Sequence, residues 1–542
     1  MYVGLILSNA NFTISILQIR MKDNGASHFS STILFLSLVA LYLFLQLFRL
    51  PATPILFEGD HAVHLSNAWR MYLGEEPFRD FFLFTFPGTE IYYFVWLKLL
   101  GVKLWILNAT IFCLLLAISA VGLFFSRQLL TGWAVYLPVS IFIVIGFRTL
   151  GIDGSHRFFS VLCVLLAIAI LFPHRTFSRL ILAGALCGFA SLFTQPRGLI
   201  CLAAIVSFLL VEKFYKKQNL SAFIYSVTSV ALPFFLIIGF TSVYFIISAG
   251  LENYYFATFV FPVKHYSADV WNNPNAFLRD VPDFRTTPLS FYLRQAAPIL
   301  FNYVLIPLIY LLFFVVLRLK GKNISVEKKL QLIFLNLAGL FLAIGVFSAP
   351  TSIRLYQVSI PGLISFVWII QNFFHFPRIM LSFLLALGLL GLSYSFQRQT
   401  VPVYFLETPS GPTVFLSKEI SSRYEWVAEN SQPNDYLYEA LHPSLYMIFQ
   451  LRNPTPMPLI RPNNYTSTEQ VESILKGLEQ NSPRFIIWNG VWETPEAKQS
   501  PDFHLQPLVD FIHTSYHRVG ELDNFNDVNN NVEYKIEIWE KN

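Results

Sequence analysis

Residues 105–125 read WILNATIFCLLLAISAVGLFF, an uninterrupted run without a charged side chain. An α-helix rises about 1.5 Å per residue, so a run of this length crosses the apolar core of a lipid bilayer. Of the 542 residues in the chain, 54% are hydrophobic and 13% are charged. This charged fraction is about half that of an ordinary soluble domain, which excludes a water-soluble globule of this size. The sequence therefore predicts a polytopic α-helical membrane protein.

Ten further apolar runs accompany this one. Together they predict eleven spans, at 31–49, 105–125, 131–147, 157–173, 179–194, 198–212, 222–248, 297–317, 330–348, 355–371 and 379–396. Several are shorter than the roughly 20 residues that a perpendicular span needs, so counts from nine to thirteen stay open.

The loops between these runs alternate in charge. One set holds fourteen Lys and Arg residues and three acids, whereas eleven acids lie in the other set. The positive-inside rule places the first set in the cytoplasm. We therefore predict a cytoplasmic segment at 1–30 and a transmembrane domain at 31–396, with two long outer loops at 50–104 and 249–296. In the first loop, 64–73 and 89–100 have the apolar spacing of amphipathic helices that lie in the membrane interface.

The tail, 397–542, differs from the front of the chain in charge and pattern. It carries a net charge of −8, whereas residues 1–396 carry +13. Helical spacing at 415–430 and 468–478, with Thr466 or Thr468 as the cap of the second helix, accompanies strand patterns at 435–440, 484–488 and 532–539. These signals predict a small soluble α/β domain on the outer side. Neither part has the charge pattern of a nucleic-acid-binding protein.

Two carboxylates in the first outer loop are candidates for catalysis. Asp60 lies in Phe57-Glu58-Gly59-Asp60-His61, and Asp80 follows twenty residues later. Acids at a membrane surface are costly to bury, so both need an explanation. Asp60 either caps the helix that begins near His61 or has a catalytic or metal-binding role. Asp80 either forms a salt bridge with Arg79 or Arg70 or takes part in the chemistry.

Basic residues at the outer ends of different spans are candidates for phosphate binding. Arg157, Arg197 and Arg354 suit this role because a guanidinium pairs bidentately with phosphate oxygens, although each could instead be a snorkelling anchor. Lys264 and His265 in the second long loop join them. Asp153 is either a turn residue next to Gly154 or an acid that orients the substrate sugar or Arg157. The aromatic residues of the second loop are either interface anchors or part of a mobile lid over the donor.

A divalent metal site is a further candidate. It would combine Asp80 with His61, and His64, His156 and His265 are additional candidate ligands. The sequence contains no Gly-rich phosphate loop, no GxSxG elbow and no HExxH helix, so no nucleotide cofactor is predicted.

At this point the chain resembles the GT-C class of glycosyltransferases, which includes protein O-mannosyltransferases and lipid A aminoarabinose transferases. The resemblance lies in Gly59-Asp60-His61, Pro77-Phe78-Arg79-Asp80-Phe81-Phe82, Pro87-Gly88-Thr89, Thr194-Gln195-Pro196-Arg197-Gly198 and Arg354-Leu355-Tyr356. Many members have Asp-Glu in place of Asp60-His61, which leaves open whether His61 takes over the role of the second acid.

The resemblance implies an inverting transfer of a sugar from a polyprenyl-phosphate-linked donor to a lipid, glycan or protein acceptor on the outer face. In this interpretation Asp60 is the general base, and the bacterial branch of the family implies the inner membrane of a bacterium. Two alternatives remain: a transporter or flippase of lipid-linked glycans, and a non-catalytic assembly component. The position of the acids at span ends argues against the first, and the intact Asp60 argues against the second.

Overall fold

The computed structural model describes residues 25–146, 153–269 and 300–542, apart from gaps at 321–323, 374–376, 441–442, 499–502 and 528–531, together with 272–274, 276, 285, 287–290 and 292–293. Most of the predicted cytoplasmic segment, much of the second outer loop and the start of the predicted span at 297–317 lie outside the described residues.

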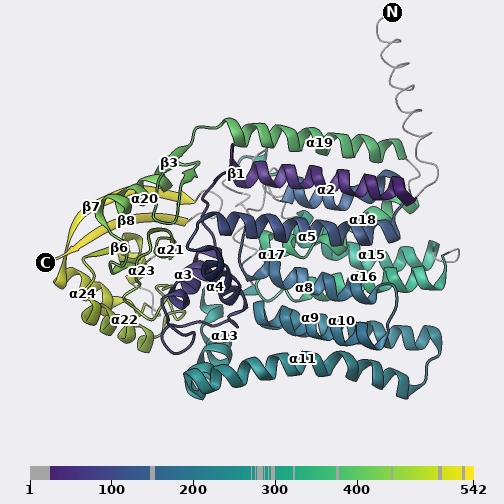
Figure 1. Cartoon of the computed structure of the whole chain (residues 1–542), viewed down its shortest axis with the longest axis horizontal. Coiled ribbons are helices and arrows are strands. Elements are labelled where there is room, and N and C mark those ends of the chain that lie inside the picture. The colour runs from purple at the N-terminus through teal and green to yellow at the C-terminus, as the bar shows by residue number, and fades with distance from the viewer. Residues whose placement is uncertain are drawn as a thin grey trace, which may run out of the picture.

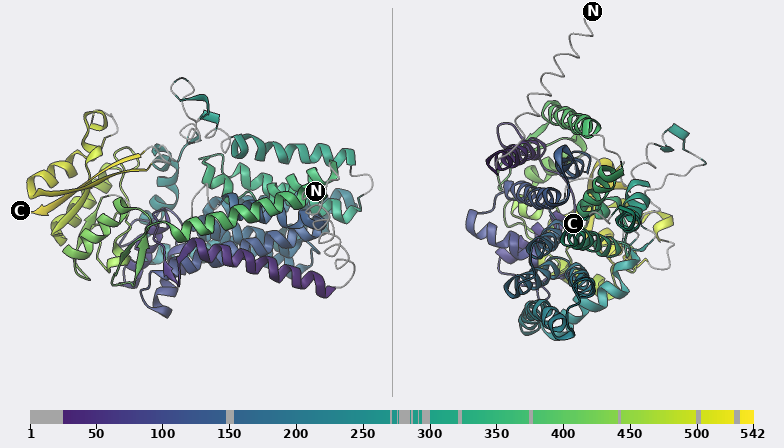
Figure 2. Two further views of the ribbon diagram at one scale, coloured as in Figure 1. Left: turned by 90° about the horizontal axis from the view of Figure 1, so that it is seen from above. Right: turned by 90° about the vertical axis from the view of Figure 1, so that its right-hand side faces the viewer.

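Apolar helices lie side by side in one bundle (Figures 1 and 2). Six helices in the described residues are long and apolar enough to cross a membrane: α2 (Gly25–Leu47), α5 (Trp105–Leu129), α10 (Gln195–Lys216), α11 (Leu220–Ala249), α16 (Val326–Ile344) and α19 (Pro377–Thr400). Shorter apolar helices coincide with the remaining predicted runs: α6 (Leu137–Ser140) with its flanking turns η1 (Gly132–Tyr136) and η2 (Ile141–Gly146), α8 (His156–Leu171), α9 (Phe177–Phe193), α15 (Ile306–Lys320) and α18 (Ile360–Phe373). The helical membrane architecture is as predicted, and eleven as the number of spans stays a prediction.

Two departures from the predicted spans have local causes. α5 continues to Leu129, one turn past the apolar run, and ends where Leu130 turns extended ahead of Gly132 with its positive φ of 60°. The run predicted as one span at 355–371 is divided, because α17 (Ser352–Gln357) ends at a turn before α18 begins at Ile360.

The first outer loop forms a short hairpin and two helices between the bundle and the tail. The hairpin pairs β1 (Phe48–Arg49) with β2 (Thr53–Pro54), and the helices are α3 (His61–Tyr72) and α4 (Gly88–Leu100). Both helices were predicted. α4 exposes apolar side chains as an interfacial helix would, whereas most of α3 is buried. The cause is the tail, which covers α3 and accepts a 2.7 Å hydrogen bond from Trp69 Nε1 at Leu451 O.

The tail contains a four-stranded sheet in the order β5 (Leu437–Glu439), β6 (Phe485–Asn489), β8 (Val532–Lys541), β7 (Tyr516–Asp527). Only β5 and β6 are parallel. Alternate residues of a strand face opposite sides of a sheet, so Ile486 and Trp488 pack with α22 (Thr468–Asn481) and α24 (Gln506–Ser515). Phe485 and Ile487 belong to the core that contains α20 (Lys418–Asn430). The helix and strand patterns predicted in the tail therefore appear, although Ser467, not Thr466 or Thr468, caps α22.

The tail is joined to the first outer loop by backbone hydrogen bonds and by a shared core. Leu56 N donates to Val414 O, Phe82 N to Pro456 O and Leu104 N to Ser410 O, each at 2.9 Å. β3 (Tyr404–Leu406) and β4 (Thr413–Phe415) form the hairpin next to this contact, and α21 (Tyr446–Phe449) packs on α3. The largest buried apolar cluster runs from the bundle into the tail without interruption. The tail thus covers one side of the first outer loop.

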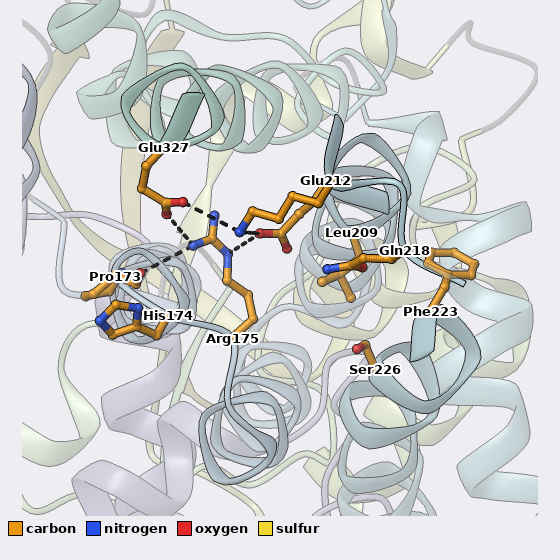
Figure 3. Close-up of a pocket in the computed structure, with 10 residues that line it drawn as sticks. Pro173, His174, Arg175, Leu209, Glu212, Gln218, Phe223, Ser226 and Glu327 are labelled. Carbon is orange, nitrogen blue, oxygen red and sulfur yellow. Dashed lines mark hydrogen bonds and ion pairs between the residues drawn. The ribbon is translucent and has the colours of Figure 1, made fainter. Parts of the chain in front are cut away.

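A charged network lies at the end of α8 that is farther from the tail. Arg175 pairs with Glu212 at 3.4 Å and with Glu327 at 2.8 Å, and Lys216 pairs with Glu212 at 2.8 Å (Figure 3). The network borders a cavity of about 210 Å³ between the ends of α8, α10, α11 and α16. Two bases and two acids neutralise one another here, so the network connects helix ends without excess charge.

Candidate active site

Asp60 occupies the N-cap position of α3, but its side chain makes no capping hydrogen bond. Its carboxylate instead pairs with Arg157, with 2.7 Å between Asp60 Oδ2 and Arg157 Nη2. The Asp60 side chain is 50% exposed, whereas that of Arg157 is 10% exposed. The carboxylate is therefore paired with a buried cation and remains half-exposed.

Asp153 approaches the same guanidinium from the other side. It accepts from Arg157 Nη1 at 3.1 Å, from Ser155 N at 2.8 Å and from Ser155 Oγ at 2.6 Å. Asp153 thus belongs to the turn and also contacts Arg157, whereas its role toward a substrate stays a prediction. Burial alone would raise the pKa of the Asp153 carboxyl, but the neighbouring His61 ring and the Arg157 charge hold it well below its ordinary value. Asp153 is an anion that fixes Arg157 between two carboxylates.

Two glycines allow the loops of the site to approach the bundle. A Cβ on Gly154 would lie 2.7 Å from Leu107 Cδ1 and 2.8 Å from the Tyr93 hydroxyl oxygen. That hydroxyl donates to Gly154 O at 2.7 Å and so fixes the loop that carries Asp153. A Cβ on Gly88 would lie 2.6 Å from Leu192 O, so only glycine lets α4 begin against the end of α9.

Two further arginines face this centre. Arg197 is buried, and its Nη1 donates to Arg157 O at 2.6 Å and to Ser160 Oγ at 3.0 Å. Arg354 donates through Nη1 to Ala349 O at 2.9 Å and through Nη2 to Asn272 Oδ1 at 2.7 Å. The charges of Arg157, Arg197 and Arg354 act on one another. Arg157 thus contacts both carboxylates, whereas Arg197 and Arg354 donate to the uncharged oxygens named above, and the three arginines interact through their charges.

The described part of the second outer loop closes one side of the site and contacts the tail. It contains α12 (Leu251–Tyr255), η3 (Phe256–Val260) and α13 (Phe261–Lys264). His265 Nδ1 lies 2.8 Å from Asn464 O, and the Phe261 and Tyr465 rings lie 5.1 Å apart. Lys264 is exposed at the end of α13. His265 thus contacts the tail, and these aromatic side chains pack between the second loop and the tail.

The Asp80 carboxylate interacts with neighbouring residues of its own loop. It accepts from Arg79 Nε at 3.1 Å, from Arg79 Nη2 at 2.8 Å and from Glu76 N at 2.8 Å. The hydrogen bond with Arg79 lowers the pKa of Asp80 below its ordinary value, because burial, which acts in the other direction, is outweighed by this bond together with Glu76 N and the charges of Arg79 and Arg70. The structure therefore shows the salt bridge with Arg79 that was the alternative to a catalytic role.

The residues predicted for a metal site do not converge. His61 Nε2 lies 3.0 Å from Phe57 O, and its Nδ1 lies 3.9 Å from Asp153 Oδ1. Asp80 interacts with its own loop. Within the described residues, no group of three or more His, Cys, Asp or Glu side chains is arranged to hold a metal ion.

The sequence interpretation missed Glu90, which lies in the first turn of α4 and is completely buried. Glu90 Oε1 lies 2.5 Å from His64 Nδ1, and His64 Nε2 lies 3.0 Å from His156 Nδ1. The available signal was an acid next to Pro87-Gly88-Thr89 at the start of an otherwise apolar helix. Arg423 was also missed: it reaches from α20 to pair with Glu58, two residues before Asp60.

No family model matches the chain, and no curated protein matches it. Among solved structures, the chain is similar to an archaeal oligosaccharyltransferase. The oligosaccharyltransferase of Archaeoglobus fulgidus in complex with Zn and sulfate aligns at 12% identity and a TM-score of 0.46, over 92% of this chain and 72% of that chain. Its apo form aligns at 11% identity and a TM-score of 0.46, over 90% and 73%. The oligosaccharyltransferase AglB of the same organism, in complex with an inhibitory peptide and a dolichol-phosphate, aligns at 12% identity and a TM-score of 0.46, over 93% and 74%.

Proposed function

We propose that this chain is a membrane glycosyltransferase that transfers a sugar from a polyprenyl-phosphate-linked donor to an acceptor hydroxyl on the outer face, with inversion. The observation that carries the proposal is the pairing of the half-exposed Asp60 carboxylate with the buried Arg157 at 2.7 Å. A structural carboxylate in this position would be expected to cap α3, which Asp60 does not do.

In this proposal Asp60 is the general base. Its carboxylate takes the proton of the acceptor hydroxyl while the hydroxyl oxygen attacks the anomeric carbon, and the bond from that carbon to the phosphate oxygen breaks. Arg157, which also contacts Asp153, holds the Asp60 carboxylate in one orientation. This preorganisation removes the cost of ordering the base at each turnover.

The leaving group is a polyprenyl phosphate anion. Arg197 is buried and Arg354 is partly buried, and a fixed guanidinium stabilises a developing anion more strongly in such surroundings than in bulk water. We assign the donor phosphate to the side of the site that holds Arg197 and Arg354. We assign Lys264 and His265, in the second outer loop, to the same side. Asp80, which is paired with Arg79, is assigned to loop structure rather than to chemistry.

The test uses purified protein, a panel of labelled polyprenyl-phosphate sugars and membrane extracts as the source of acceptor. The wild-type protein should move label from one of these donors into a lipid, glycan or protein fraction. Asp60→Asn keeps the shape of the side chain but removes the base, and it should lower the rate by about 100-fold or more. Asp510→Asn removes an exposed carboxylate in the tail and is the matched control.

A normal rate in Asp60→Asn would overturn the role of Asp60 as base. Transport of a lipid-linked glycan by the wild-type protein without any transfer of sugar would favour the flippase alternative instead.

A further inference from the structure

Three ionisable side chains from different elements form a continuous chain beside Asp60. Glu90 lies on α4, His64 on α3 and His156 at the start of α8. The distance from Glu90 Oε1 to His64 Nδ1 is 2.5 Å, and that from His64 Nε2 to His156 Nδ1 is 3.0 Å. Glu90 is 0% exposed, His64 is 5% exposed and His156 is partly exposed. These three side chains thus connect the protein interior with the edge of the proposed site.

Such a chain needs an explanation because burial of a carboxylate is costly unless it is paired. An apolar residue at position 90 would fill the same first turn of α4 without that cost. Burial alone would lower the pKa of His64, but the Glu90 carboxylate raises it above its ordinary value, with smaller contributions from Asp153 and Asp60. Glu90 therefore makes His64 a better proton acceptor than an isolated buried imidazole.

The two contacts allow one consistent arrangement of protons in each state, which we adopt. The Glu90 carboxylate accepts from His64 Nδ1, so a neutral His64 presents a bare Nε2. His156 must then donate through Nδ1, and its own Nε2 is a proton acceptor at the edge of the site. When His64 is protonated, its Nε2 donates to His156 Nδ1, and His156 Nε2 carries a hydrogen. One added proton changes the exposed nitrogen from acceptor to donor.

The outer end of this chain faces the groups of the proposed site. His156 directly precedes Arg157, and the charges of Asp153, Arg157 and Arg197 act on it. His64 faces Glu90, His156, Asp153 and Asp60. Arg157, the next residue after His156, makes the bridge to Asp60 and Asp153, and the charges of these two carboxylates act on His64.

We propose that Glu90, His64 and His156 form a proton relay that accepts the acceptor-derived proton from Asp60 and stores it beside Glu90. This inference rests on the proposed function and identifies His64, His156 and Glu90 as groups that reset the base. None of the three had been assigned a catalytic role by the sequence pattern.

The proposed step moves one proton from Asp60 to His64 and creates or removes none. Asp60, protonated by the acceptor hydroxyl, gives its proton to His156 Nε2. The hydrogen on His156 Nδ1 moves to His64 Nε2, so that His156 stays neutral and His64 becomes a cation next to the Glu90 anion. No bond other than these N–H and O–H bonds changes, and Asp60 returns to the carboxylate. Once product has left, the stored proton returns from His64 to His156 and leaves from His156 Nε2 to water, since His156 is partly exposed, and Asp60 stays a carboxylate.

The test compares the pH dependence of transfer in variants of the full-length protein. Glu90→Gln keeps the size of the side chain but removes its charge, which lowers the pKa of His64. The rate should fall by about tenfold or more, and the acidic limb of the pH profile of kcat should move to lower pH. A variant with a structural defect alone would lose rate without moving that limb. His174→Gln, at an exposed histidine by the opposite end of α8, is the matched control and should behave like the wild type.

His156→Gln separates a relay from a simple hydrogen bond to substrate. A glutamine amide places a donor near the position of Nε2 but cannot pass a proton between two nitrogens. We expect a loss of about tenfold or more in kcat with little change in KM. A wild-type rate in His156→Gln, or an unmoved acidic limb in Glu90→Gln, would overturn the relay.

A measurement that does not depend on activity keeps the two proposals distinguishable. In protein labelled with ¹⁵N-histidine, the His64 signals, assigned by their loss in His64→Gln, should titrate at higher pH in the wild type than in Glu90→Gln. An identical titration in both proteins would overturn the relay even if transfer is observed. Absence of transfer from every donor, combined with a shifted His64 titration, would overturn the proposed function while leaving the storage of a proton on His64 supported.

Discussion

Arg423 in the tail forms an ion pair with Glu58 in the first outer loop, two residues before Asp60. Arg423 Nη2 also donates to Ser444 Oγ at 2.9 Å, and Ser444 Oγ donates to Glu439 at 3.1 Å. The segment that carries Asp60 is therefore fixed to the interior of the tail.

Replacement of Arg423 should disturb stability and activity together. The Arg423 side chain is 7% exposed, and Arg423→Met would leave Glu58 without this partner. We expect a loss of about 3 kcal/mol in the free energy of unfolding, measured by thermal unfolding in detergent. Arg484→Met is the control, since the Arg484 side chain is 70% exposed in its pair with Glu540 and should contribute less than about 1 kcal/mol. Equal losses in both variants would contradict a special role for Arg423.

Arg157→Lys should lower kcat more than it weakens donor binding. A lysine ammonium cannot bridge Asp60 and Asp153 with the planar geometry of a guanidinium. We expect a decrease of about 100-fold in kcat and a change of less than about tenfold in KM for the donor. The two constants are measured with the donor found active in the panel. An effect confined to KM would mean that Arg157 binds the phosphate and does not orient the base.

Arg354→Gln should weaken donor binding more than it lowers kcat. Arg354 is held by Ala349 O and Asn272 Oδ1 and faces the positive side of the centre, where we place the donor phosphate. Loss of its charge should raise the inhibition constant of sugar-free polyprenyl phosphate by about tenfold. The control is the affinity of the same variant for the uncharged polyprenol, which should not change. A parallel loss for both lipids would point to a packing defect.

Glu439 should make the stability of the wild-type protein depend on pH. Burial raises its pKa to about 7, although Arg423 and the hydrogen bonds from Leu445 N and Ser444 act in the other direction. The folded state therefore binds this proton more tightly than the unfolded state. This contribution to stability is present below the ordinary pKa of glutamate and is lost as pH rises through about 7.

Glu439→Gln removes this titration and retains groups for the same hydrogen bonds. Between pH ~5 and pH ~8 the free energy of unfolding of the wild type should decrease by about 3 kcal/mol relative to that of the variant. Thermal unfolding at both pH values measures the difference. Parallel behaviour of the two proteins would show that Glu439 does not titrate in this range.

Much of the fold follows from local patterns, because apolar runs and strand alternation are properties of neighbouring residues. The run at 105–125 predicts α5 to within a turn, and the spacing at 468–478 predicts α22. The predicted cap of α22 was wrong, because a cap depends on a single residue. Ser467 caps the helix through its 3.4 Å contact with Gln470 N, whereas the pattern indicated Thr466 or Thr468. The burial of α3 was not predicted, because a segment almost four hundred residues away covers it.

The site was predictable only in part for the same reason. Charge and position along the chain indicated Asp60, Asp153 and the arginines. They did not show that Arg157 is shared between two carboxylates, and they left open whether Asp80 pairs with Arg79. Glu90 resembled an acid placed favourably at a helix N-terminus, and only the packing of α3 against α4 brings His64 to it.

The pairing of Glu58 with Arg423 joins residues 365 positions apart in the chain. During synthesis, the segment with Asp60 emerges long before the residues that fix it. A nascent chain that has already formed its first helices therefore lacks the contact that anchors the segment with Asp60 until the tail has been made and has folded onto the first loop. The order of residues along the chain delays the appearance of a competent site until biogenesis of the whole protein is complete.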